Sequence, residues 1–228
     1  MITSYDTMPL AAYEQVRAIL RNDALDDADV TSGLIAALTD TSVEAVDALP
    51  IGDYAALSAS LHFLSVVPQP SGKRPPKKMD IGGVRFILTL DPGKLTAAQF
   101  IDFQEFNDKG DLVGVVATCL VPEGCTYNRT EARWKGDKTY EPEEVRDIVR
   151  RWVTVQEAVD IVDFFQRRSV RSVMRSLSYL ERSEMLRPWR KGSKERLAKI
   201  RAAKASLRDG AGLLRLMKSR KSPGRPGR

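Results

Sequence analysis

The sequence is poor in the residues that build disulfide frameworks, metal centres and stacking surfaces. Its 228 residues include two cysteines, one histidine and only 7% aromatic residues. The two cysteines, Cys119 and Cys125, are too few for a disulfide framework and are typical of a reducing compartment. A zinc site built on them would lack half of its ligands, and the single His62 excludes a histidine-rich centre. We therefore expect no metal and no cofactor.

Long apolar runs are also missing. No stretch reaches the roughly 18 apolar residues of a membrane-spanning helix. Asp6 and Glu14 interrupt the opening residues, where a signal peptide would need an apolar segment. Hydrophobic residues nevertheless make up 43% of the chain, which is enough for a core and too many for a wholly disordered protein. The sequence predicts a soluble intracellular protein.

The net charge of +6 conceals a strong asymmetry along the chain. Residues 187–228 contain 15 basic and two acidic residues, a net charge of +13. Residues 1–186 carry −7, and most of the acidic excess lies in residues 1–66, which carry −8. The sequence therefore combines a mildly acidic body with a strongly basic tail.

Composition and apolar periodicity divide the chain into four regions. We predict an acidic helical region over 1–66, a linker rich in proline and lysine over 67–78, a β-hairpin with helices over 79–186, and a basic tail over 187–228. The helices of the first region are short, so their apolar stripes must pack on one another or on a partner. The expected fold class is α+β, predominantly α-helical with a small β-hairpin and a partly disordered C-terminal tail, the disorder being expected over 218–228.

Several helix starts are marked by residues that suit the first turn of a helix. Thr7, Ser42 and Asp53 are predicted to cap three short helices, because their side-chain oxygens accept hydrogen bonds from free backbone N–H groups. Thr96 is predicted to start a later helix, and Pro142 another. The other expected elements are a hairpin turn at Gly82-Gly83, a buried helix over 112–121, a polar loop over 126–139, a long helix over about 154–185 and a basic amphipathic helix over 193–207.

No motif in the chain assembles into a catalytic centre. Gly72-Lys73 lacks the preceding glycine of a phosphate-binding loop, and the acidic run 23–29 lacks the glycine and glutamate of a calcium-binding loop. The carboxylates of 143–147 are explained by the preference for acidic residues at a helix start. Asp102 and Glu105 are interpreted as the solvent face of their helix. We therefore do not expect an enzyme.

The basic tail indicates a binding function. Its charge could neutralise several phosphates, but Trp189 is its only aromatic residue, so base stacking would be weak. Nucleic acid and an acidic protein are the two leading alternatives, a tail without a specific role is the third, and a membrane surface is the least favoured. The candidate contacts are Arg187, Arg190, Lys191, Lys194, Arg196, Lys199, Arg201 and Lys204.

Three stretches of the chain resemble a family of phage proteins. They are LTDTSVEAVDALPIGDYAALSASLHFL at 38–64, VRFILTLDPGKLTAAQFIDFQEF at 84–106, and LVPEGCTYN at 120–128 together with EPEEVRDIVRRWVTVQEAVDIVDFF at 141–165. Their Leu-Pro, Tyr, Phe-Leu and Gln-Phe-x-Asp-Phe patterns are similar to phage tail assembly chaperones of tailed phages, including crAss-like and other Bacteroidetes phages. The basic tail from Arg187 onward departs from the family pattern.

The resemblance implies a non-enzymatic morphogenesis protein of the host cytoplasm that binds tape-measure or tail-tube subunits. Amphipathic helices suit this role because their apolar faces can cover client helices. The candidate client contacts are Tyr54, Phe63, Leu64, Phe100, Phe103 and Phe106. The alternative is a virion structural protein of the head or neck, or a packaged protein, which uses its basic C-terminal tail to bind DNA.

Overall fold

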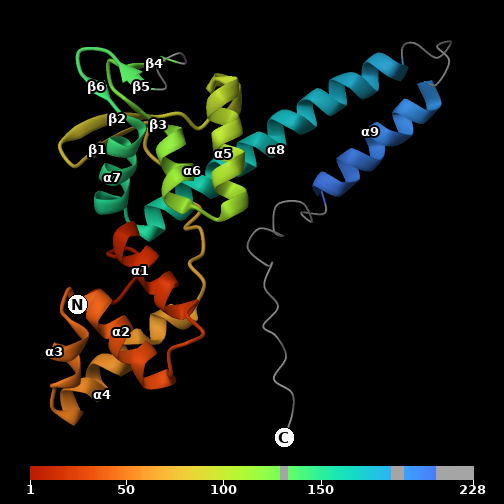
Figure 1. The fold of residues 1–228 in the computed structure, drawn as a ribbon. Coiled ribbons are helices and arrows are strands. Elements are labelled where there is room, and N and C mark those ends of the chain that lie inside the picture. Colours follow the sequence, from red (N-terminus) through yellow and green to blue (C-terminus); the bar gives the residue numbers. More distant parts are fainter. Residues whose placement is uncertain (129–132, 186–192, 209–228) are drawn as a thin grey trace, which may run out of the picture.

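A computed structural model of the chain describes residues 1–128, 133–185 and 193–208. The described residues are mostly helical and include two small antiparallel sheets. Helices and sheets form a body, from which one long helix projects with a second helix packed against its far end (Figure 1). The predicted α+β class with predominant helices is confirmed.

The N-terminal region consists of short helices, as predicted. They are α1 (Leu10–Leu20), α2 (Asp27–Thr39), α3 (Val43–Asp47), α4 (Ile51–Ser60) and the 3-10 helix η1 (Leu61–Ser65). The predicted cap at Ser42 is confirmed, because its hydroxyl oxygen accepts a hydrogen bond from the Ala45 N–H at 3.2 Å.

Two of the predicted caps are wrong. Pro9 precedes α1, and the Thr7 hydroxyl instead donates to the Ser4 carbonyl at 3.3 Å. Pro50 precedes α4, so Asp53 lies inside the first turn, where the helix dipole still favours a carboxylate. In both cases a proline with fixed φ sets the start of the helix.

The first sheet contains the predicted hairpin and one further strand. Strand β1 (Lys78–Ile81) pairs with β2 (Val84–Leu88), and β2 pairs with β3 (Leu120–Pro122), each pair being antiparallel. Gly82 and Gly83 form the turn with φ of 57° and 79°, values that glycine adopts without strain. A Cβ at Gly82 would lie 2.7 Å from the Trp152 ring, so both the turn and the neighbouring helix require glycine there.

The predicted polar loop over 126–139 is wrong, because it holds a second antiparallel sheet. Its strands are β4 (Thr126–Asn128), β5 (Arg133–Lys135) and β6 (Thr139–Tyr140). Trp134 is 5% exposed and packs edge-on against Tyr127 with ring centroids 4.9 Å apart. These two aromatic rings supply the apolar face that the polar composition of the segment conceals.

Three helices complete the body: α5 (Ala97–Lys109), α6 (Leu112–Cys119) and α7 (Pro142–Trp152). The helix starts predicted at Thr96 and Pro142 are confirmed, and Thr96 forms a capping box with Gln99. Every residue of α6 from Val113 onward is buried. The predicted helix over 112–121 is too long, because the chain enters β3 at Leu120 to pair with the hairpin.

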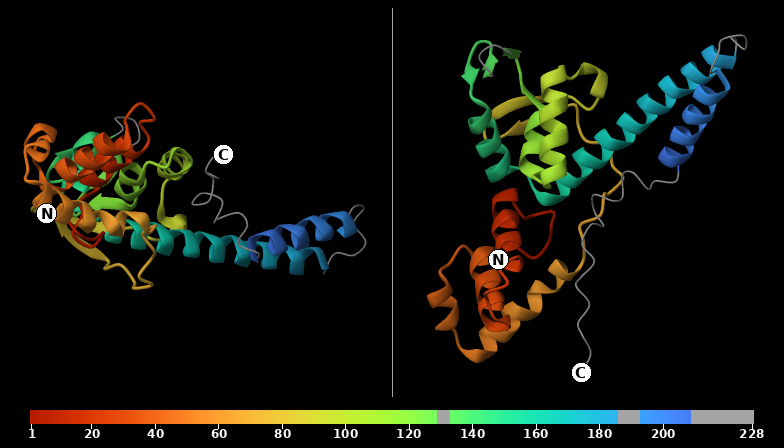
Figure 2. Two further views of the ribbon diagram at one scale, coloured as in Figure 1. Left: turned by 90° about the horizontal axis from the view of Figure 1, so that it is seen from below. Right: turned by 45° about the vertical axis from the view of Figure 1, so that its right-hand side comes forward.

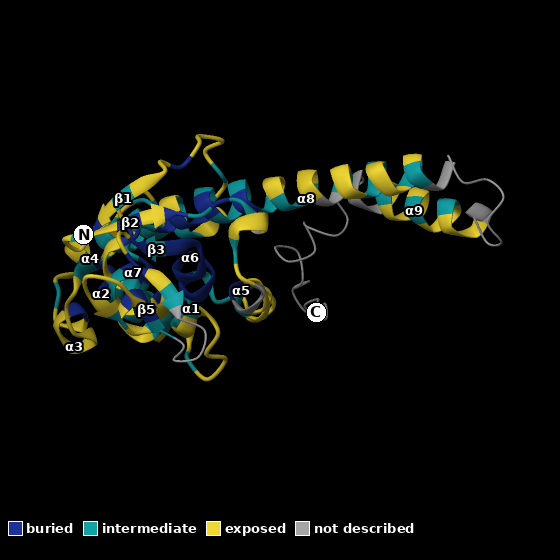
Figure 3. Cartoon of the chain, turned by 90° about the horizontal axis from the view of Figure 1, so that it is seen from above, coloured by how far each residue is buried: buried dark blue, intermediate teal, exposed yellow. Residues whose placement is uncertain are grey.

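The long helix α8 (Val155–Met185) belongs to the body at one end and leaves it at the other. Ala158, Ile161 and Phe165 of its first three turns are buried. Its far end projects beyond the body (Figure 2) and is largely exposed (Figure 3). Helix α9 (Ser193–Arg208) folds back along that far end, which confirms the expected basic helix. The disorder predicted over 218–228 lies outside the described residues.

The linker predicted over 67–78 is extended but is held against α8. The Ser71 backbone N–H and hydroxyl donate to the Asp160 carboxylate at 2.6 and 2.7 Å, and the Gln156 amide donates to the Gln69 carbonyl at 2.9 Å. The segment therefore follows a defined path between the N-terminal helices and the first sheet. None of the helices in the described ranges has the length and apolarity needed to cross a bilayer.

Candidate binding pocket and basic arm

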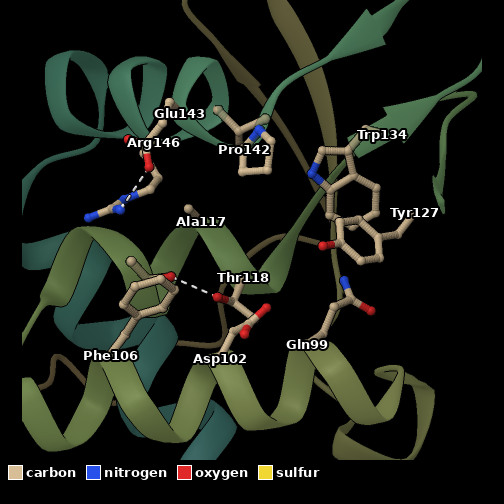
Figure 4. Close-up of a pocket in the computed structure, with 12 residues that line it drawn as sticks. Gln99, Asp102, Phe106, Ala117, Thr118, Tyr127, Trp134, Pro142, Glu143 and Arg146 are labelled. Atoms are coloured by element: carbon tan, nitrogen blue, oxygen red, sulfur yellow. Dashed lines mark hydrogen bonds and ion pairs between the residues drawn. The ribbon is translucent and has the colours of Figure 1, made fainter. Parts of the chain in front are cut away.

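Helices α5, α6 and α7 and the second sheet enclose a cavity of about 120 Å³ (Figure 4). Phe106 of α5 lies at one end, and Tyr127 of β4 and Trp134 of β5 lie at the other. The rings make much of the lining apolar, while Gln99 and Asp102 of α5 contribute polar groups. We call this cavity the α5–α7 pocket.

Gln99 places an unsatisfied hydrogen-bond donor in the pocket. Its side chain is needed for the capping box, in which Oε1 accepts from the Thr96 backbone N–H at 3.0 Å. Gln99 is only 6% exposed, and its Nε2 has no hydrogen-bond partner among the described residues. Figure 4 shows the amide directed toward Tyr127. A buried amide N–H group without an acceptor destabilises the folded protein, and a bound acceptor would remove that cost.

Asp102 contributes a carboxylate one turn further along α5. Burial raises the pKa of Asp102, and the negative charge of Glu105 raises it further. Within the described residues Asp102 makes no hydrogen bond or ion pair. The pKa of Tyr127 is raised in turn, first by burial and then by the charge of Asp102. The interpretation of Asp102 as a solvent-face residue is thus wrong, whereas Glu105 does face solvent and pairs with Lys109 at 2.6 Å.

The cation at the other end of the pocket is already neutralised. Arg146 donates to Asp111 at 2.8 Å and pairs with Glu143 at 3.1 Å. Its guanidinium also lies over the Phe106 ring, 5.1 Å from the centroid. Among the described residues, Asp102 is therefore the charged group of the pocket that no ion pair compensates, which makes it complementary to a group that donates hydrogen bonds, such as a basic or amide side chain.

The three phenylalanines predicted on α5 have different environments. Phe100 is 37% exposed and Phe106 lines the pocket. Phe103 is 6% exposed and packs on Phe165 with ring centroids 4.3 Å apart. The structure contradicts Phe103 as a client contact, because that face of α5 is covered by α8.

Tyr54, Phe63 and Leu64 do not join the pocket. Tyr54 packs on a small cluster within the N-terminal helices, and the Phe63 ring lies 5.3 Å from the Tyr5 ring. Leu64 is half-buried against the main core. These three residues belong to α4 and η1 and are absent from the lining of the α5–α7 pocket, so the predicted client contacts form two separate groups.

The basic candidates are also divided. Arg201 and Lys204 of α9 bind Glu181 of α8 at 3.1 and 2.6 Å, and these bonds lower the pKa of Glu181. Lys199 pairs with Glu195 within α9 at 2.9 Å. Arg196 is exposed and Lys194 lies in α9, while Arg187, Arg190 and Lys191 lie outside the described residues. Part of the basic tail therefore holds the two-helix arm together.

Gln99, Tyr127 and Trp134 are pocket residues that sequence reasoning did not identify. Gln99 could have been found as the third residue after the Thr96 cap, the position that completes a capping box. Tyr127 and Trp134 are aromatic residues in a polar segment, which is a signal for a small packed sheet. Comparisons with protein-family models, curated proteins and solved structures found no match for the chain.

Proposed function

We propose that the chain is a non-enzymatic phage tail assembly chaperone that binds a segment of a tape-measure or tail-tube subunit in the α5–α7 pocket. The observation that carries this proposal is a convergence of the resembling stretches. Residues 84–106 supply Gln99, Asp102 and Phe106, residues 120–128 supply Tyr127, and residues 141–165 supply Arg146. Segments far apart in the sequence thus line one cavity.

The chemistry of the pocket favours a client side chain that carries N–H groups. Its apolar part would contact Phe106 and Trp134, and its N–H groups would donate to Asp102. Gln99 Nε2 would donate to a client carbonyl oxygen. Phe100 and Ile101, 37% and 60% exposed, offer further apolar surface on α5. The acidic excess of the body would also steer a basic client toward it.

A charge reversal in the pocket tests this proposal. The chain is co-expressed with the tape-measure or tube protein of the same phage, and the amount of co-purified client is measured. We expect Asp102→Lys to reduce client capture by about tenfold or more, as for a central interface residue. Asp108→Lys, which makes the same charge change at an exposed position of α5, should leave capture within about twofold. Equal capture by both variants, or no capture by the wild type, would contradict the proposal.

The second candidate function is a virion structural protein that uses its basic C-terminal tail to bind DNA. The observation that favours it is the projecting arm formed by α8 and α9 (Figure 3). Arg196 of α9 is exposed on this arm. Mass spectrometry of purified phage particles separates the two functions. A chaperone is expected to be absent from the finished particle, whereas a head, neck or packaged protein is expected in defined copy number.

A further inference from the structure

Helix α8 carries a row of arginines beyond the body and before the basic tail. The row consists of Arg168, Arg171, Arg175 and Arg182, with Tyr179 between the last two. Steps of three, four, four and three residues place all five side chains on one face of a helix. At 1.5 Å per residue the row extends over about 21 Å. We call these five residues the arginine row.

The row faces away from the helix that packs on α8. Val170, Leu177 and Glu181 lie on the other face and are half-buried in the arm, where α9 binds Glu181 through Arg201 and Lys204. The four arginines of the row are exposed, and Tyr179 is 74% exposed. Packing of α9 therefore fixes the rotation of α8 that presents the row to solvent.

The charges of the row are not neutralised within the described chain. Arg167, which lies beside the row, pairs with Asp163 at 2.9 Å. In contrast, none of the row's arginines forms an ion pair with another described residue. Arg168 lies over the Phe164 ring, 5.6 Å from its centroid, which orients the guanidinium without removing its charge.

The composition of the row favours phosphate as the ligand. Helix α8 contains five arginines and no lysine, and the planar guanidinium binds phosphate oxygens in pairs, whereas an ammonium acts as a point charge. The exposed Tyr179 among the arginines adds a ring on which a base can stack, as in proteins that bind single strands. The carboxylates of an acidic protein could pair with the arginines, but they supply no planar base that would stack on the ring of Tyr179.

We propose that the arginine row of α8 binds single-stranded nucleic acid, with the arginines on the phosphates and Tyr179 on a base. This site is separate from the α5–α7 pocket and from residues 187–228. The proposal is therefore independent of the proposed chaperone function.

The test measures binding of the full chain to a fluorescent oligothymidine of about 20 nucleotides, longer than a typical single-strand site. We expect Arg171→Gln/Arg175→Gln to weaken binding and to reduce the slope of log K against log salt by about 1.4, since each lost phosphate contact removes about 0.7. Arg171→Lys/Arg175→Lys should restore the slope. The matched control Lys73→Gln/Lys77→Gln removes two exposed charges from the body and should leave the slope unchanged.

Further measurements distinguish single-stranded nucleic acid from other ligands. Tyr179→Ala should weaken oligothymidine binding by roughly tenfold and Tyr179→Phe should not, because stacking needs the ring alone. The proposal is overturned if a duplex binds more tightly than the oligothymidine, or if poly-glutamate competes equally at the same charge concentration. It is also overturned if the Arg171/Arg175 double variant binds like the control. Circular dichroism of each variant verifies that the helices are intact.

Discussion

At the scale of single residues, environment decides what two similar carboxylates do. Burial raises the pKa of Asp102, which has no cation beside it in the described chain. Hydrogen bonds from Lys204 and Arg201 lower the pKa of Glu181, because they favour its charged form. The first carboxylate is the proposed binding group and carries a cost in stability, and the second is a structural contact that contributes stability.

The raised pKa of Asp102 predicts a pH-dependent cost. Folding disfavours the charged form of Asp102. Its contribution to the free energy of unfolding is therefore favourable below the pKa of the unfolded state and is lost as pH rises through the pKa of the folded state. We expect Asp102→Asn to be more stable than the wild type at neutral pH, with the advantage disappearing at about pH 3, where both side chains are neutral. Urea unfolding at the two pH values measures this. Asp108→Asn is the exposed control, and an advantage for Asp102→Asn that is equal at both pH values would contradict the burial argument.

At the scale of elements, the arm depends on one acidic residue that binds two basic ones. Helix α9 contacts α8 along its far end, where half-buried Leu197 and Ile200 of α9 face that helix. Glu181 adds ion pairs to Arg201 and Lys204 at the same interface. A basic helix is thus held on an arginine-rich helix because the few apolar residues and Glu181 all lie between them.

Replacing Glu181 should release α9 from α8. The lowered pKa of Glu181 means that its contribution is present above the unfolded pKa and is lost as pH falls through the folded pKa. We expect Glu181→Gln to speed amide hydrogen exchange throughout α9 at neutral pH while leaving α6 unchanged. The control is Glu195→Gln, which removes only the pair with Lys199 inside α9. Unchanged exchange in α9 of Glu181→Gln would show that apolar packing alone holds the arm.

At the scale of the whole molecule, α8 connects the body to the projecting arm. Its first turns pack Phe165 into the core against Phe103, and its far end is exposed beyond the body (Figure 3). The pocket lies in the body, and the arginine row lies on the arm. One continuous helix therefore links a proposed protein-binding site to a proposed nucleic-acid site.

This division predicts unequal effects of two aromatic substitutions in the same helix. Phe165→Ala removes a fully buried ring and should lower the free energy of unfolding of the body by about 3–5 kcal/mol. Tyr179→Ala removes an exposed ring and should change it by less than about 0.5 kcal/mol. Denaturant unfolding of the two variants provides the comparison. Similar losses in both would contradict the exposure of Tyr179, because an exposed ring contributes little to the free energy of unfolding.

Features that depend on residues close together in the sequence agree with the prediction, whereas features that depend on contacts between distant residues do not. The starts at Ser42, Thr96 and Pro142 were predicted correctly because a cap and its partners lie within one turn. The second sheet was missed because its strands are short and polar. Its stability comes from Trp134 packing at the pocket, a contact with residues distant in the sequence.

By itself, the sequence determined the predominance of helix, the turn at Gly82-Gly83 and the separation of acidic body from basic tail, since these depend on composition and near neighbours. Only the tertiary structure decided that Phe103 is core and that Asp102 faces a cavity, because both lie on α5 and their burial depends on what packs there. The exposure of the arginine row was decided in the same way. Helix α9 occupies the opposite face of α8, and no periodicity in α8 alone states which face a distant helix will cover.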